Sequence, residues 1–129
     1  MILLCDEDVG AGVPKALDAV GDEARSLRGM AWGGRADEFW LTKAGQLGWL
    51  VLSCNKGMLK VRAEKDTIVR ERVGIIFLTT GADHPPTVLM RLLKKRSDLE
   101  MLWDTTPKPF ARFLFGNNRL SETFRDYRL

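Results

Sequence analysis

The chain has 129 residues, of which 45% are hydrophobic and 29% charged, values typical of one soluble globular domain with its own core. No apolar run approaches the roughly 20 residues that a membrane-spanning helix needs, and acids from position 6 onward argue against a signal peptide. Two cysteines and one histidine provide neither a disulfide framework nor zinc-like spacing, so we expect a cytoplasmic protein.

The net charge of +3 is divided unevenly along the chain. Residues 1–55 hold 5 Lys/Arg and 8 Asp/Glu, whereas residues 56–129 hold 15 Lys/Arg and 9 Asp/Glu. An acidic part beside a basic part suits a metal site next to a phosphate-binding surface, although ordinary surface charge can give the same division.

The first predicted element is a buried strand that ends in acids. The apolar run over residues 2–5 leads directly into Asp6, Glu7 and Asp8. It is too short for a buried helix, so we expect a parallel strand with acids at its carboxyl end, where open α/β sheets bind ligands. A divalent cation would relieve the repulsion between crowded carboxylates. The alternative is a solvated loop in which Asp8 caps a helix.

Helices and strands then alternate along the first half of the chain. Apolar spacing predicts a helix over 13–20, a short strand over 23–27, a loop over 29–34, a helix over 36–47 and a buried strand over 49–53. Asp37 and Glu38 lie in the first turn of the second helix, where the helix dipole favours carboxylates. Asn55 follows the buried strand in a turn-rich group.

The second half continues this pattern. We expect an interrupted basic helix over 58–72, a buried strand over 73–80, a loop over 81–86, a helix over 86–95, a short strand over 101–103, and a last strand over 110–115 with a hairpin-like turn at 116–118. The alternation predicts a three-layer α/β/α sandwich with a mostly parallel central sheet. We expect a single domain over 1–120 and a charged tail over 121–129.

Three oxygen-bearing side chains are expected to meet at one edge of this sheet. Asp6 follows the first strand, Asp37 begins a helix, and Asn55 follows the next strand. Hard oxygen ligands of this kind suit Mg²⁺ or Mn²⁺ better than zinc.

At these positions the sequence resembles the PIN-domain ribonucleases, most closely the compact PIN-like subgroup of the fold that VapC toxins of bacterial toxin–antitoxin pairs adopt. The resemblance covers roughly residues 2–120. It is carried by residues 3–8, 36–40, 44–56, 73–78 and 109–113.

The resemblance implies roles for individual residues. Asp6 matches the invariant Asp after the first strand, Asp37 matches the Asp at a helix start, and Asn55 matches the final Asp or Asn. All three would be catalytic and would hold the metal. The compact subgroup usually has Asp at the last position, so Asn55 is either natural or an inactivating substitution. The further Glu of classical PIN domains has no convincing match here, and Asp8, Glu38 and Glu64 are candidates for its place, Asp8 and Glu38 also as additional metal ligands.

The implied activity is metal-dependent cleavage of RNA phosphodiester bonds by a toxin, with Mg²⁺ or Mn²⁺ activating a water. The implied partners are an RNA substrate such as tRNA or rRNA, an antitoxin protein and a second copy in a homodimer, with no membrane. Lys56, Lys60 and Arg62 would contact the RNA backbone, or they form a solvated helix face. Trp32 would stack on a base or contact a partner.

Two other functions compete with this one. A phosphoacceptor receiver domain also begins with a strand and paired acids and has a Lys-Pro pair like Lys108-Pro109, but Asn55 stands where it needs a phosphorylated Asp. A PIN fold that has lost catalysis and serves as a binding module would explain both Asn55 and the missing Glu.

Overall fold

Short buried strands and amphipathic helices alternate through the first part of the computed structural model, which describes residues 1–79, 84–122 and 128–129. The elements are β1 (Leu3–Cys5), α1 (Gly12–Ala19), β2 (Ala24–Ser26), α2 (Asp37–Leu47), β3 (Leu50–Ser53), α3 (Arg62–Arg70) and β4 (Gly74–Leu78). Two 3₁₀ turns, η1 (Glu7–Val9) and η2 (Lys56–Lys60), follow β1 and β3. β1, β3 and β4 therefore lie where apolar runs predicted buried strands, and β2 lies within the short strand predicted over 23–27.

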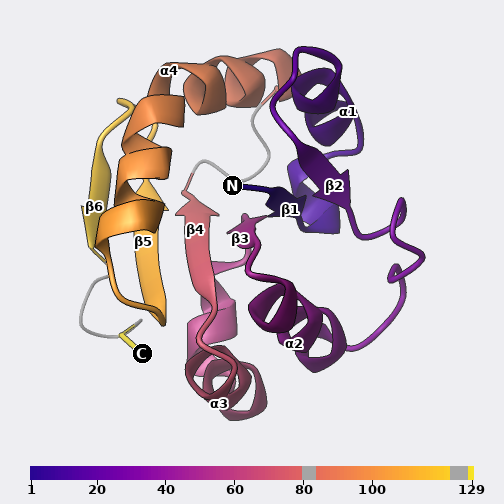
Figure 1. Cartoon of the computed structure of the whole chain (residues 1–129), viewed down its shortest axis with the longest axis vertical. Coiled ribbons are helices and arrows are strands. Elements are labelled where there is room, and N and C mark those ends of the chain that lie inside the picture. Colours follow the sequence, from indigo (N-terminus) through magenta and orange to yellow (C-terminus); the bar gives the residue numbers. More distant parts are fainter. Residues whose placement is uncertain (80–83, 123–127) are drawn as a thin grey trace.

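The chain is completed by α4 (Pro85–Thr105), β5 (Phe110–Leu114) and β6 (Leu120–Glu122). The six strands form one sheet in the order β2-β1-β3-β4-β5-β6, parallel throughout except for the β5–β6 pair (Figure 1). The carboxyl ends of β1 and β3 are neighbours in this order, so the residues that follow them meet at one edge.

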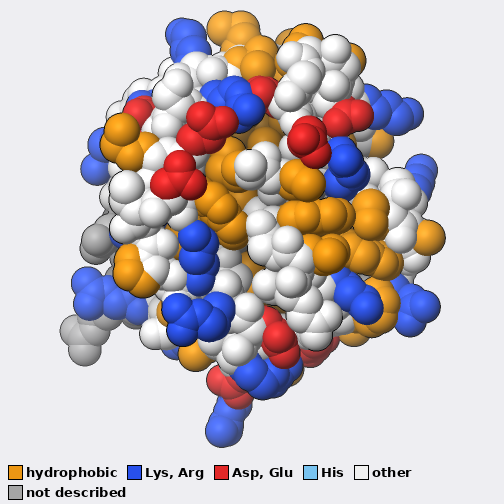
Figure 2. Space-filling model, in the orientation of Figure 1, with side chains coloured by type: hydrophobic (Ala, Val, Ile, Leu, Met, Phe, Trp, Pro, Cys, Tyr) orange, Lys and Arg blue, Asp and Glu red, His pale blue; other side chains and the backbone are white. Residues whose placement is uncertain are grey.

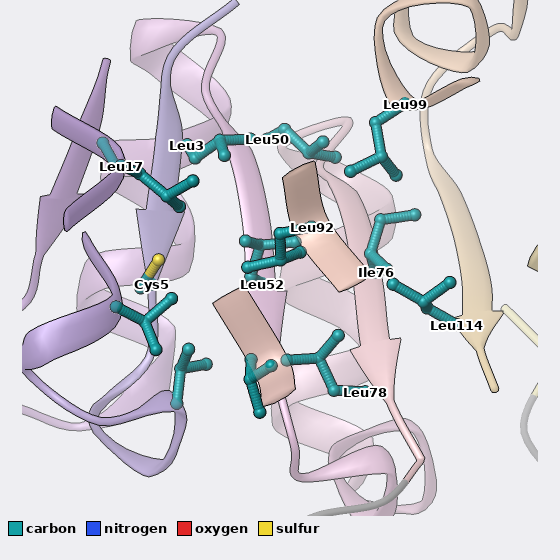
Figure 3. Packing of buried hydrophobic residues seen from close by; sticks show 14 of the residues in the cluster. Leu3, Cys5, Leu17, Leu50, Leu52, Ile76, Leu78, Leu92, Leu99 and Leu114 are labelled. Atoms are coloured by element: carbon teal, nitrogen blue, oxygen red, sulfur yellow. The ribbon is translucent and has the colours of Figure 1, made fainter. Parts of the chain in front are cut away.

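Two hydrophobic clusters on opposite faces of the sheet make up the core. On one face, side chains of α1 and α4 such as Leu17, Leu92 and Leu99 cover Leu3, Leu52 and Ile76 of the strands (Figure 3). On the other face, α2 and α3 bring Trp40, Leu41 and Ile68 onto Leu4, Val51 and Phe77. This confirms the three-layer sandwich around a mostly parallel sheet.

Two of the predicted elements were wrong. Residues 101–103 are not a strand but lie in the last turns of α4, which is longer than the predicted helix because its buried face continues from Val88 and Leu92 to Leu99. Ser121 and Glu122, assigned from the sequence to the charged tail, instead belong to β6 (Leu120–Glu122), which pairs with β5 across the predicted turn. The predicted loop over 81–86 lies largely outside the described residues, and Pro85 already begins α4.

No helix within the described ranges is both long and apolar enough to cross a membrane.

Candidate metal-binding site

Asp6 is fixed at the point where β1 ends. Its Oδ1 accepts a hydrogen bond from the backbone N–H of Glu7 at 2.7 Å, which caps η1, and its Oδ2 accepts one from Ser53 Oγ at 2.9 Å. The backbone N–H of Asp6 also donates to the carbonyl oxygen of Leu52 at 2.8 Å. The carboxylate is thus oriented by two adjacent strands.

Ser53 links the ends of β1 and β3. Its hydroxyl donates to Asp6 and accepts from the backbone N–H of Asn55 at 3.0 Å, and the residue is fully buried. Asp8 also links the residues that follow β1 and β3, since its Oδ1 accepts a hydrogen bond from the backbone N–H of Cys54 at 3.0 Å. Sequence reasoning treated Ser53 only as a strand residue, although a hydroxyl at the end of an otherwise apolar strand was a usable signal.

Asp37 approaches the same edge from α2. It is half-buried in the first turn of the helix, and its Oδ1 accepts a hydrogen bond from Trp40 Nε1 at 3.1 Å. Trp40 is buried in the core, so it holds the Asp37 carboxylate in a fixed orientation.

Glu64, in the first turn of α3, faces Asp37. Their carboxyl groups are close enough for hydrogen bonding to contribute to the raised pKa of Glu64, while Glu64 Oε2 is buried and has no hydrogen-bond partner. Desolvation, followed by the bond and charge of Asp37 and the charges of Glu38 and Asp6, raises the pKa of Glu64 to about 7. Of the candidates for the missing Glu, Glu64 is the one in contact with an expected metal ligand.

These side chains form one electrostatic unit, which we call the acidic cluster: Asp6, Asp8, Asp37, Glu38 and Glu64. Burial and the charge of Asp8 raise the pKa of Asp6 to about 6, and burial also raises that of Asp8. Burial is the largest cause of each shift, and the charges of neighbouring carboxylates add to it. Among the described residues, no three His, Cys, Asp or Glu side chains are yet grouped tightly enough to hold a metal ion. The cluster therefore supplies suitable oxygens, but a cation would have to draw them together.

The remaining predicted residues lie around the cluster. Asn55 is exposed and begins η2, without a side-chain cap bond. Lys56 and Lys60 are exposed on η2, and Arg62 is 94% exposed and pairs with Asp66 at 3.7 Å. Trp32 is half-buried against two other rings, with centroids 6.4 Å from Phe39 and 6.1 Å from Trp49.

A family model described as a PIN-like domain matches residues 1–80. The chain belongs to the PIN-like domain family. The matched stretch contains β1 to β4 and every member of the acidic cluster. PIN-like domains are commonly nucleases and generally use divalent metals, so the family supports a nuclease-type fold over the receiver alternative. No curated protein and no solved structure gave a significant match.

Proposed function

We propose that the acidic cluster holds Mg²⁺ or Mn²⁺ and that the protein is an endoribonuclease. The observation that carries the proposal is the contact between Glu64 and Asp37, with Glu64 Oε2 buried and unpaired. Two carboxyl groups in hydrogen-bond contact need either a shared proton or a cation between them. A donor set made only of oxygens favours Mg²⁺ or Mn²⁺.

The roles of the residues follow from their contacts. Asp6, Asp37 and Glu64 would supply the ligand oxygens, with Asn55 adding an amide oxygen at the edge. Ser53 would orient Asp6, and Trp40 would orient Asp37, as outer hydrogen bonds do for metal ligands. A bound divalent ion lowers the pKa of a coordinated water and stabilises the leaving oxygen of a phosphodiester.

The resemblance to VapC toxins extends the proposal to partners. We propose that the substrate is tRNA or rRNA, that Lys56, Lys60 and Arg62 contact its phosphates, and that an antitoxin neutralises the enzyme by covering the acidic cluster, commonly with an Arg. A homodimer is the proposed assembly, in the cytoplasm.

The test is cleavage of total tRNA and rRNA with Mn²⁺ or Mg²⁺, alongside Mn²⁺ binding measured by calorimetry. The variants are Asp6→Asn, which removes a ligand charge, Asn55→Asp, which adds one, and Asp104→Asn as a control on the exposed part of α4. We expect metal-dependent cleavage that Asp6→Asn and EDTA abolish and Asp104→Asn leaves unchanged. Absence of both cleavage and Mn²⁺ binding in every form would refute the proposal.

A second candidate is a PIN-like binding module without catalysis. It is favoured by Asn55, an exposed neutral amide at a position where the compact subgroup usually has Asp. If only Asn55→Asp cleaves RNA, the chain as it stands is an inactive form of a nuclease. If the chain binds Mn²⁺ and RNA but neither form cleaves, the module is the better description.

A further inference from the structure

Beside the acidic cluster, on the side toward β2, the surface is hollowed by a cavity of about 400 Å³. Asp6 and Glu7 line one side of it, and Lys15 of α1 and Arg28 of the loop after β2 line the other. This volume lies within the range of about 300–1,000 Å³ that small-ligand sites occupy. The proposed RNA contacts at Lys56, Lys60 and Arg62 do not line this cavity, and the resemblance assigned no role to Lys15 or Arg28.

The cavity combines cationic and apolar surfaces. Lys15 and Arg28 are exposed, and neither has an ion-pair partner among the described residues. Pro14 and Leu27 contribute apolar wall between them. Gly10 and Ala11, just before α1, also line the cavity. Cations attract a phosphate, and an apolar wall accommodates a base.

A second hollow of about 410 Å³ continues the first. It is lined by Glu7, Arg28, Ala31, Gly33 and Gly34, so the two share Glu7 and Arg28. A Cβ on Gly33 would come within 3.0 Å of Glu7 Oε1, which means that the loop backbone lies close to this carboxylate. Two hollows joined at an Arg form a track longer than one small ligand requires. On the face drawn in Figure 2, Lys and Arg side chains are scattered among acids rather than gathered in one broad patch.

We propose that these two hollows, here called the Arg28 track, bind single-stranded RNA next to the acidic cluster. Lys15 and Arg28 contact phosphates, Pro14 and Leu27 face a base, and Glu7 accepts hydrogen bonds from base amino groups. Asp6 lines one of the two hollows, so an RNA strand bound in the track would have a neighbouring phosphodiester bond at the proposed metal site. This inference rests on the proposed nuclease function, and it names where the substrate strand lies.

The test is binding of a fluorescein-labelled ten-nucleotide single-stranded RNA in EDTA, measured by anisotropy over a range of salt concentrations. The track variant is Lys15→Gln/Arg28→Gln. The control is Arg72→Gln/Lys94→Gln, which removes the same charge from exposed sites between α3 and β4 and on α4. Each phosphate contact to a single strand contributes about 0.7 to the slope of log K against log salt. We expect the track variant to bind at least about tenfold more weakly and to lose about 1.4 from this slope, with the control close to the parent.

Equal affinity and equal slope in the two double variants would overturn the track. The chemical shifts of the backbone amides give a second measurement, because a dinucleotide bound in the track should perturb Gly10, Gly29 and Gly33. Shift changes confined to other regions would also overturn the RNA-binding proposal.

The RNA-binding proposal and the nuclease proposal can fail separately. If the track variant loses RNA binding and the parent protein does not cleave RNA, the RNA-binding proposal stands and the nuclease proposal fails. If the parent cleaves RNA in a metal-dependent way and the track variant binds RNA as well as the parent does, the nuclease proposal stands and the RNA-binding proposal fails.

Discussion

Glu64 and Asp37 meet across two helices, close enough for hydrogen bonding to contribute to the raised pKa of Glu64, and one buried oxygen of Glu64 has no hydrogen-bond partner. Asp37 lies in the first turn of α2 and Glu64 in the first turn of α3. The positive ends of two helix dipoles therefore stabilise a concentration of negative charge that the core beneath them would otherwise disfavour.

Cation binding at this pair should depend on pH. A carboxyl with a pKa of about 7 is mostly protonated at pH 6 and mostly ionised at pH 8. A cation competes with the proton, so Mn²⁺ should bind roughly tenfold more tightly at pH 8 than at pH 6. Calorimetry at both pH values measures this. In Glu64→Gln the residual affinity should change far less, and an equally steep change in that variant would contradict the assignment.

The same pair should make the metal-free protein less stable as the pH rises. The pKa of Glu64 is about 7 in the folded state against 4.5 ordinarily, so the folded chain binds more protons between these values. The free energy of unfolding contributed by this group then falls as the pH rises through that window. We expect Glu64→Gln to be about 0.5–1 kcal/mol more stable than the parent at pH 8, after allowing for screening by solvent, and equal to it near pH 4. Urea unfolding in EDTA gives both values; a gain of the same size at both pH values would point to packing instead.

Ser53→Ala should weaken both the fold and the site. The buried hydroxyl bonds to Asp6 and to the backbone of Asn55, and its removal leaves those groups without a partner. The expected loss in the free energy of unfolding is about 1–3 kcal/mol, with weaker Mn²⁺ binding because Asp6 loses an orienting contact. Ser97→Ala, at an exposed position of α4, should change stability by less than about 0.5 kcal/mol. If the two variants behave alike, Ser53 has no such role.

Gly45→Ala should separate α2 from α3. A Cβ at Gly45 would lie 2.8 Å from the Cβ of Glu71 and would also collide with the Glu71 backbone. We expect a loss of about 1–3 kcal/mol in the free energy of unfolding and reduced Mn²⁺ affinity, because these helices carry Asp37 and Glu64. Gly12→Ala on α1 is the matched control, since a Cβ there has open space. It should be neutral or stabilising by up to about 1 kcal/mol, and a comparable loss there would show that close packing is not the cause.

Prediction from sequence succeeded where one local property determines the structure. Runs such as 50–52 and 74–78 are apolar throughout and too short for helices, which favours buried strands. The strand predicted over residues 101–103 was wrong, because three successive apolar residues can belong to either a strand or a helix. In the structure Met101 is exposed, and the buried Leu99 continues the apolar face of α4. Prediction from sequence also missed β6, whose Leu-Ser-Glu sequence has no strand pattern and is defined by pairing with β5.

For the site, the positions of Asp6 and Asp37 follow from strand ends and helix starts, and the structure couples their charges. The metal roles of Asp6, Asp37 and Asn55 stay predictions. Glu64 could only be one candidate among three, because its distance from Asp37 depends on how α2 packs on α3. The hydroxyl of Ser53 at the end of an apolar strand hinted at a polar role, but its partner Asp6, 47 positions away, could not be read from the local sequence.

The residues that match the family model make up only part of the folded sheet. The family match ends at residue 80, yet β4 pairs with β5 over all five of its residues, and Phe77 packs on Phe113 with ring centroids 6.0 Å apart. A polypeptide cut at residue 80 would expose an apolar, unpaired strand and invite self-association. Every member of the acidic cluster lies within the matched residues 1–80, but the sheet that carries the cluster is completed by strands outside that match.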